Sequence, residues 1–171
     1  MEFREYRIIQ ASTKALLFRK CECGGYTTPV IINDLVFDQE IFYCHSKCKK
    51  IITEFKIAYK LPLIVLNTMT SKLESIVAYD DTVADFIGCL PKQYLKYLKE
   101  DNLLSRKLEE ALVGISCAAK LDRKRGNDQS TKAKKLLILT DGEKINLIDI
   151  IRNGSDDIHF GDDDEDDDDI S

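Results

Sequence analysis

The sequence lacks tryptophan, contains three prolines and two methionines, and has no apolar run long enough to cross a membrane. A membrane-spanning helix needs about 20 consecutive apolar residues, so we expect no membrane segment. The N-terminus, MEFRE, carries charges where a secretory signal peptide needs an apolar stretch. We therefore expect a non-secreted protein whose six cysteines stay reduced and serve as metal ligands or buried apolar groups.

Acidic and basic residues are unevenly distributed along the 171-residue chain. Residues 154–171 hold ten of the 30 acidic residues and none of the 25 basic ones, which leaves residues 1–153 with a net charge of +5. We expect residues 1–153 to form one folded domain and residues 154–171 to be a disordered acidic tail, because that run cannot bury enough apolar surface to fold. A basic body suits a polyanionic ligand.

Segments typical of strands and helices follow one another in an order typical of a small β barrel. Apolar alternation and β-favouring residues predict strands over residues 3–19, 53–66, 73–79, 113–121 and 134–140. Helical spacing predicts a helix from Asp80 to Gly88 and another over residues 92–100, whereas residues 145–151 fit a strand or a short helix. We therefore predict a mainly β fold with helices, a five-stranded OB-fold Greek-key barrel.

Four of the cysteines form two close pairs, Cys21-x-Cys23 and Cys44-x3-Cys48. Two tight turns can each present two thiolates toward one point, which is the arrangement that a tetrahedral structural zinc ion needs. We predict a zinc ribbon inserted over about residues 20–50. Two alternatives stay open: His45 replaces one of the thiolates, or the four cysteines are ordinary reduced side chains.

The remaining features argue against an enzyme. Cys89 and Cys117 lie in apolar surroundings without a close partner, so we expect both to be buried. Glu22 is the only carboxylate within the cysteine turns, and the sequence has no Gly-rich phosphate loop and no nucleophile–base pair. We expect no catalytic residues, and we expect zinc to be structural.

The segments LFRKCEC at 17–23, FYCHSKC at 42–48 and FKIAYKL at 55–61 together resemble the C-terminal DNA-binding domain of the large subunit of replication protein A. SIVAY at 75–79, followed by TVADFIG at 82–88, extends the resemblance, which covers about residues 3–152. The family implies an OB fold with a zinc ribbon after its first strand and single-stranded DNA binding through the barrel face.

Carried over by position, the resemblance makes Cys21, Cys23, Cys44 and Cys48 the zinc ligands and Tyr79 a base-stacking residue. The chain departs from the family in both cysteine spacings. Only residues 144–153 precede the acidic tail, where the family has a long assembly helix, and we expect no companion OB domains. We therefore expect a divergent stand-alone relative, a specialised or viral one, that acts in the nucleus or at a site of viral DNA replication.

Basic clusters fall where an OB groove contacts its ligand, although a solvated charged loop is the alternative for residues 120–135. The predicted nucleic-acid-binding residues are Lys56, Lys60, Tyr79, Lys120, Arg123, Lys124, Arg125, Lys132, Lys134 and Lys135. The leading hypothesis is a non-catalytic single-stranded-DNA-binding protein for replication, repair or recombination. The alternative is a protein-interaction OB module that assembles a replication, repair or telomere complex. In this interpretation, the acidic tail either competes with nucleic acid for the basic groove or docks partner proteins.

Overall fold

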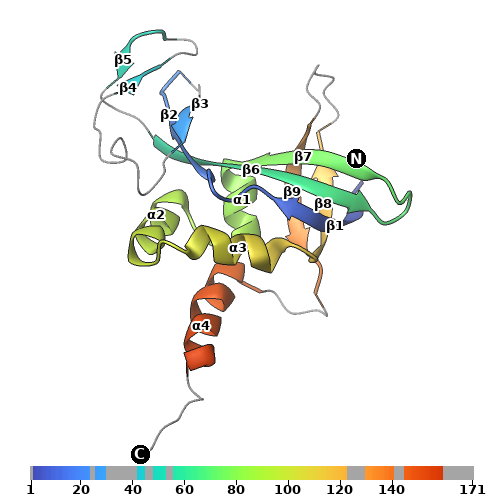
Figure 1. Cartoon of the computed structure of the whole chain (residues 1–171). Helices are drawn as coiled ribbons and strands as arrows, with labels where there is room; N and C mark the ends of the chain where they lie inside the picture. The colour runs from blue at the N-terminus through green and yellow to red at the C-terminus, as the bar shows by residue number, and fades with distance from the viewer. Residues whose placement is uncertain are drawn as a thin grey trace, which may run out of the picture.

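The computed structural model describes residues 2–23, 26–29, 42–44, 48–52, 56–122, 130–140 and 145–159. The strands are β1 (Arg4–Ala11), β2 (Leu17–Lys20), β3 (Tyr26–Pro29), β4 (Phe42–Tyr43), β5 (Ile51–Ile52), β6 (Lys56–Asn67), β7 (Leu73–Tyr79), β8 (Ser116–Leu121) and β9 (Thr131–Ile138). The helices are α1 (Asp80–Ile87), α2 (Pro91–Glu100), α3 (Leu104–Leu112) and α4 (Leu147–His159). Figure 1 shows α2, α3 and α4 gathered on one side of the strands, while β4 and β5 lie apart from them.

Five of the strands close into a barrel. β1 pairs antiparallel with both β6 and β8, β6 pairs with β7, and β8 pairs with β9. A short parallel pairing of β7 with β9 completes the ring. Five strands in this order form the Greek-key barrel of the OB fold. The predicted fold class is confirmed: a mainly β barrel with helices and an inserted cluster of four cysteines.

The first barrel strand bends and leads into the insertion. β1 pairs with the second half of β6, and β2 pairs with the first half of β6, from Leu17 opposite Tyr59 to Lys20 opposite Lys56. The bend between them is tied to α3 by Thr13, whose hydroxyl donates to the Ser105 carbonyl at 2.7 Å. After β2 the chain enters the ribbon, in which β4 and β5 form a separate two-stranded sheet.

The core fills the barrel and continues under the helices. On β6 the inward residues Leu61, Leu63 and Val65 are at most 1% exposed, which fits the two-residue period of a strand with one buried face. Leu104, Leu108 and Leu112 recur every fourth residue on α3, so they share one helix face, and all three are buried. Burying each such side chain stabilises the fold by about 1.5–3 kcal/mol, so the barrel has an extensive apolar core of its own.

Helix α1 follows β7 without a loop and ends where the sequence predicts. Gly88 has a φ of 98° and donates its N–H to the Ala84 carbonyl at 2.8 Å. A β-carbon at Gly88 would collide with the Asn146 side chain, whose amide donates to the Gly88 carbonyl at 2.9 Å. Because Asn146 also accepts from the Asp149 N–H at 3.1 Å at the start of α4, the glycine sets where α4 begins.

The last described element is a helix. Residues 145–151 fitted either a strand or a helix, and the structure places Leu147–His159 in α4. The helix therefore includes residues 154–159, which the sequence analysis assigned to the tail, while residues 160–171 lie outside the described residues. The boundary and the disorder of the tail stay predictions. Over the described ranges, none of the helices combines the length and the hydropathy required to cross a membrane.

Candidate nucleic-acid interface and metal centre

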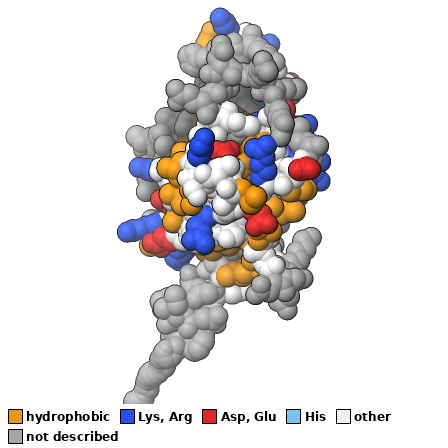
Figure 2. Space-filling model, turned by 90° about the vertical axis from the view of Figure 1, so that its right-hand side faces the viewer, with side chains coloured by type: hydrophobic (Ala, Val, Ile, Leu, Met, Phe, Trp, Pro, Cys, Tyr) orange, Lys and Arg blue, Asp and Glu red, His pale blue; other side chains and the backbone are white. Residues whose placement is uncertain are grey.

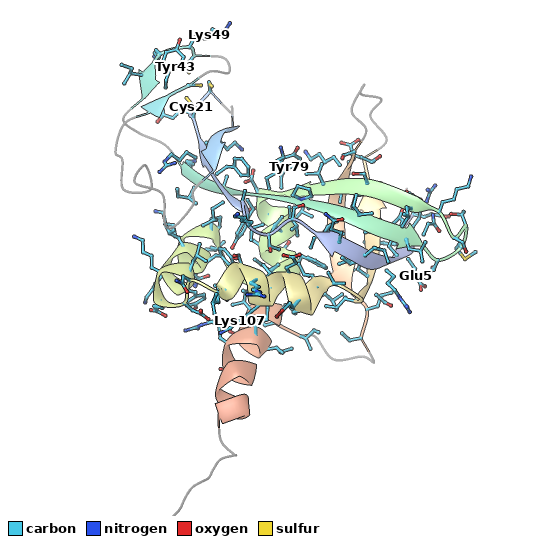
Figure 3. The ribbon with its side chains drawn as sticks, viewed as in Figure 1. Glu5, Cys21, Tyr43, Lys49, Tyr79 and Lys107 are labelled. Atoms are coloured by element: carbon cyan, nitrogen blue, oxygen red, sulfur yellow. The ribbon has the colours of Figure 1, made fainter. Side chains whose placement is uncertain are left out.

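The four predicted zinc ligands lie together where the barrel meets the ribbon (Figure 3). The Sγ atoms of Cys21 and Cys48 are 3.4 Å apart, and those of Cys23 and Cys44 are 3.7 Å apart. All four sulfur atoms lie within 4.8 Å of one another. Cys21 and Cys44 are buried, and Cys23 and Cys48 are half-buried. Residues from two separate turns therefore converge on one point.

This arrangement fits a tetrahedral metal ion. Zinc–sulfur bonds of about 2.3 Å place the sulfurs of a tetrahedron about 3.8 Å apart, close to both distances given above. Hydrogen bonding to the Cys21 and Cys23 thiols raises the pKa of Cys48 to about 12, so the Cys48 thiol holds its proton without a cation. A divalent ion reverses this preference because it stabilises thiolates. The cluster is therefore compatible with zinc. His45, which belongs to the alternative ligand set, lies outside the described residues.

Backbone geometry brings the second cysteine pair into position. Cys44 follows β4 and donates its N–H to the Lys50 carbonyl at 3.0 Å, which folds the chain back before β5. The Tyr43 hydroxyl donates to the Lys49 carbonyl at 2.8 Å, and Lys49 has a φ of 54°. A left-handed conformation is uncommon for a residue other than glycine and marks a tight turn. This turn directs Cys48 toward the first cysteine pair.

Three of the predicted nucleic-acid-binding residues meet on the outer face of β6, β7 and β9. Lys60 is the cross-strand partner of Tyr79 in the pairing of β6 with β7. The Lys132 Nζ, from the adjacent strand β9, lies 5.8 Å from the centre of the Tyr79 ring. In Figure 3, Tyr79 lies on the side of the sheet that faces away from α2, α3 and α4. The structure thus combines an aromatic ring with two ammonium groups on one open surface.

Further predicted lysines lie on neighbouring strands. Lys120 of β8 and Lys135 of β9 are cross-strand partners, and Lys56 is exposed at the start of β6 opposite Lys20. Like charges directly opposite each other are unfavourable in a sheet unless another group offsets them. Asp80 forms an ion pair with Lys20 at 3.1 Å, so the Lys120–Lys135 pair marks the place where an anion would lower the electrostatic energy of the barrel.

The remaining predicted residues are placed only in part. Lys134 is exposed, and its carbonyl accepts a hydrogen bond from the Thr82 hydroxyl of α1 at 3.0 Å. Arg123, Lys124 and Arg125, which belong to the connection between β8 and β9, lie outside the described residues. Their part in the interface stays a prediction.

Sequence reasoning missed two residues of this surface. Phe18 on β2 lies under Lys60, whose Nζ is 5.7 Å from the centre of the ring. Lys20, next to the cysteine cluster, forms an ion pair of 3.1 Å with Asp80, which directly follows Tyr79. In the sequence, Phe18 ends an apolar run that obscures the alternation of β2. Leu17 and Arg19 are buried, whereas Phe18 and Lys20 are half-buried. Only that alternation could have identified the outward ring.

The two other cysteines are buried, as predicted. Cys117 is 0% and Cys89 is 8% exposed. Burial raises the pKa of Cys117 to about 11 and also raises the pKa of Cys89. Since the thiolate is the reactive form of cysteine, both thiols are unsuited to nucleophilic chemistry and serve as apolar core groups.

Comparison with known proteins gives a likeness of structure and none of sequence. No protein-family model and no curated protein matches the chain. Yeast RPA bound to ssDNA has a similar structure, with a TM-score of 0.52 and 12% identity over 92% of this chain and 85% of that chain. At this identity the likeness shows the fold alone, and it agrees with the OB barrel described above.

Two further structures are more distant. A chain of a replication protein A heterotrimer bound to ssDNA has a TM-score of 0.45 and 13% identity over 91% of this chain. The present chain spans about a third, 34%, of the length of that one. The structure of fission yeast Pot1 and Tpz1 gives a TM-score of 0.33 and 8% identity, with 81% of this chain and 82% of that chain covered. Neither similarity is strong enough to carry an argument.

Proposed function

We propose that this protein binds single-stranded DNA, without catalysing a reaction, in DNA replication, repair or recombination. The observation that carries the proposal is the grouping of Lys60, Tyr79 and Lys132 on the open outer face of the barrel. Proteins that bind single strands combine a basic groove for the backbone with aromatic side chains on which bases stack. The grouping supplies both components at one place.

The charge distribution supports a polyanionic ligand. Lys120 and Lys135 lie opposite each other on the same barrel, and an anionic backbone would offset their mutual repulsion. A zinc ion held by the four cysteines would join the two turns of the ribbon and serve structure, because four protein ligands leave no open position for catalysis. We infer a divergent relative of the C-terminal DNA-binding domain of the replication protein A large subunit, acting in the nucleus or at a site of viral DNA replication.

Replacing the ring of Tyr79 tests the proposal. Tyr79→Ala should weaken binding to labelled oligo-dT by about 1–3 kcal/mol, the value of one stacked base, as measured by fluorescence anisotropy. Tyr97→Ala is the matched control, since Tyr97 is a half-buried tyrosine on α2 that stacks on Arg152 at 3.7 Å, on the helical side. Equal affinities of the Tyr79 variant and the wild type would contradict a stacking role for this face.

A second candidate function, assembly of a protein complex, is favoured by a different surface. Leu137 and Leu139, at the end of β9 and just after it, are 50% and 41% exposed, and Phe3 beside β1 is 45% exposed. Figure 2 shows hydrophobic side chains at the surface of the molecule, interspersed with basic and acidic ones. If assembly is the function, charge reversal on the basic face leaves complex formation with the protein partner intact, whereas Leu137→Glu with Leu139→Glu abolishes complex formation.

A further inference from the structure

Four side chains from four neighbouring strands alternate between aromatic and basic across the outer face. The strands lie in the order β2, β6, β7 and β9, and they contribute Phe18, Lys60, Tyr79 and Lys132. The Lys60 Nζ lies 5.7 Å from the Phe18 ring centre, and the Lys132 Nζ lies 5.8 Å from the Tyr79 ring centre. Lys60 is also the cross-strand partner of Tyr79. The strand that carries Lys60 therefore lies between the strands that carry the two rings.

The two rings come from strands that are separated by β6, a spacing wider than that of two stacked bases. Neighbouring strands are separated by about 4.8 Å, and β6 lies between the strands that carry the rings. Phe18 and Tyr79 thus start from backbones about 10 Å apart. A nucleic acid that crosses the strands can place one base on each ring only if those bases are unstacked, which a duplex does not allow.

Lys60 and Lys132 occupy ring faces that a base would use. A cation over an aromatic ring is held weakly when the site is exposed to water, and Lys132 is exposed while Lys60 is half-buried. A flat base can replace either ammonium group because its stacking buries more ring surface. The displaced ammonium then remains within a side-chain length of the backbone that carries that base.

We propose that Phe18 and Tyr79 are separate platforms for two unstacked bases and that Lys60 contacts the phosphate between them. The inference rests on the proposed single-strand binding and adds Phe18 as a base-contacting residue. The ligand it defines is a single strand that crosses β2, β6 and β7 with its bases splayed to either side of Lys60. Discrimination against duplex follows from the separation of the rings.

Phe18→Leu tests the second platform while it keeps an apolar side chain on β2. Its affinity for oligo-dT should fall at least about fivefold, the lower end of the value of a stacked base, and Phe18→Tyr should restore it. An oligonucleotide of the same length with abasic sites separates stacking from packing. On that probe the wild type and Phe18→Leu should bind equally, while Lys60→Met should weaken binding to both probes because it removes a phosphate contact.

The outcomes separate this inference from the proposed function. Wild-type binding to oligo-dT with no loss in Phe18→Leu would overturn the second platform and leave single-strand binding standing. An equal loss on oligo-dT and on the abasic probe would also overturn it, since that result assigns Phe18 a structural role. Failure of the wild type to bind either probe would refute the proposed function together with the inference. The zinc content and the unfolding midpoint of each variant establish that it is folded.

Discussion

The barrel and the ribbon are held together by different forces. The barrel closes five strands around buried side chains such as Leu61, Leu63 and Val65, which are at most 1% exposed. In the described part of the ribbon, β4 and β5 are each two residues long, and Ile51 of β5 is 67% exposed. A pair of strands this short is not stable by itself. We therefore expect the barrel to fold around its own apolar core, whereas the ribbon would depend on a metal ion at its four cysteines.

The two regions meet beside the proposed interface. The ion pair between Lys20 and Asp80 links the last residue before Cys21 with the first residue after Tyr79. Asp80 also accepts a hydrogen bond from the Tyr59 N–H at 3.3 Å and has a φ of 40°. An aspartate in this conformation is uncommon, and its two contacts hold it there. The ribbon and Tyr79 are therefore adjacent in structure although they are far apart in sequence.

Loss of one cysteine should give the largest loss of stability, and that loss should be confined to the ribbon. Cys44→Ser removes a ligand that is 0% exposed, and structural zinc contributes about 10–16 kcal/mol of binding free energy in small zinc domains. We expect the variant to lose stoichiometric zinc in metal analysis and to lose hydrogen-exchange protection at β4 and β5. Far-UV circular dichroism of the barrel should stay close to that of the wild type.

Cys117→Ala is the control for this change, because Cys117 is equally buried but belongs to the barrel core. It should keep one zinc ion per chain. Zinc bound at the wild-type ratio by Cys44→Ser would contradict the four-cysteine site and favour a ligand set in which another residue, such as His45, takes part.

A cavity in the barrel core should give the next largest loss of stability, and it should act on the barrel rather than on the ribbon. Leu63 is 1% exposed within β6, and a change of buried leucine to alanine lowers the free energy of unfolding by about 2–5 kcal/mol. Urea unfolding followed by circular dichroism measures this loss. The matched change Ile51→Ala, at an exposed ribbon position, should stay within about 0.5 kcal/mol. A larger loss of unfolding free energy for Ile51→Ala than for Leu63→Ala would show that the apolar core is not what stabilises the barrel.

Charge reversal tests which of the two regions contacts nucleic acid. We expect the smallest loss of affinity from the change in the ribbon. Arg123→Glu with Lys124→Glu should weaken oligo-dT binding about tenfold or more and flatten its salt dependence by about one unit of slope for each lost phosphate contact. Lys49→Glu with Lys50→Glu should have less effect, because Figure 3 shows Lys49 at the far end of the ribbon from Tyr79. Titrations at two salt concentrations measure both. Equal losses would extend the interface over the ribbon.

Local signals in the sequence predicted much of the fold. The strand at 73–79, the helix that starts at Asp80 and its end at Gly88 all appear in the structure. Each depends on neighbouring residues only: β-favouring residues in the strand, apolar residues at helical spacing, and a glycine that can end a helix. The N-cap is Tyr79, without a side-chain cap, where the sequence favoured the polar residues Asp80, Asp81 and Thr82. The strand predicted over 113–121 begins later, at Ser116, because Gly114 adopts a φ of 93° and turns the chain.

The interface was predictable only in part, because it depends on contacts between strands. The cysteine spacing predicted the cluster, since two tight turns can converge on one ion. The contact of Lys60 with Phe18 and that of Lys132 with Tyr79 depend instead on which strands become neighbours when the barrel closes. Periodicity along β2 can indicate that Phe18 points outward, but it contains no information about which lysine lies beside the ring.

The most direct test of the central claim is a fluorescence-anisotropy titration of the zinc-loaded protein with labelled oligo-dT, with a duplex of the same length and with oligo-U, at two salt concentrations. The account predicts micromolar or tighter binding to oligo-dT, weaker binding to duplex, and an affinity that falls as salt rises. The oligo-U titration establishes whether the face prefers DNA or RNA. Absence of binding to all three probes, with zinc bound, would contradict single-strand binding and leave complex assembly as the function of this barrel.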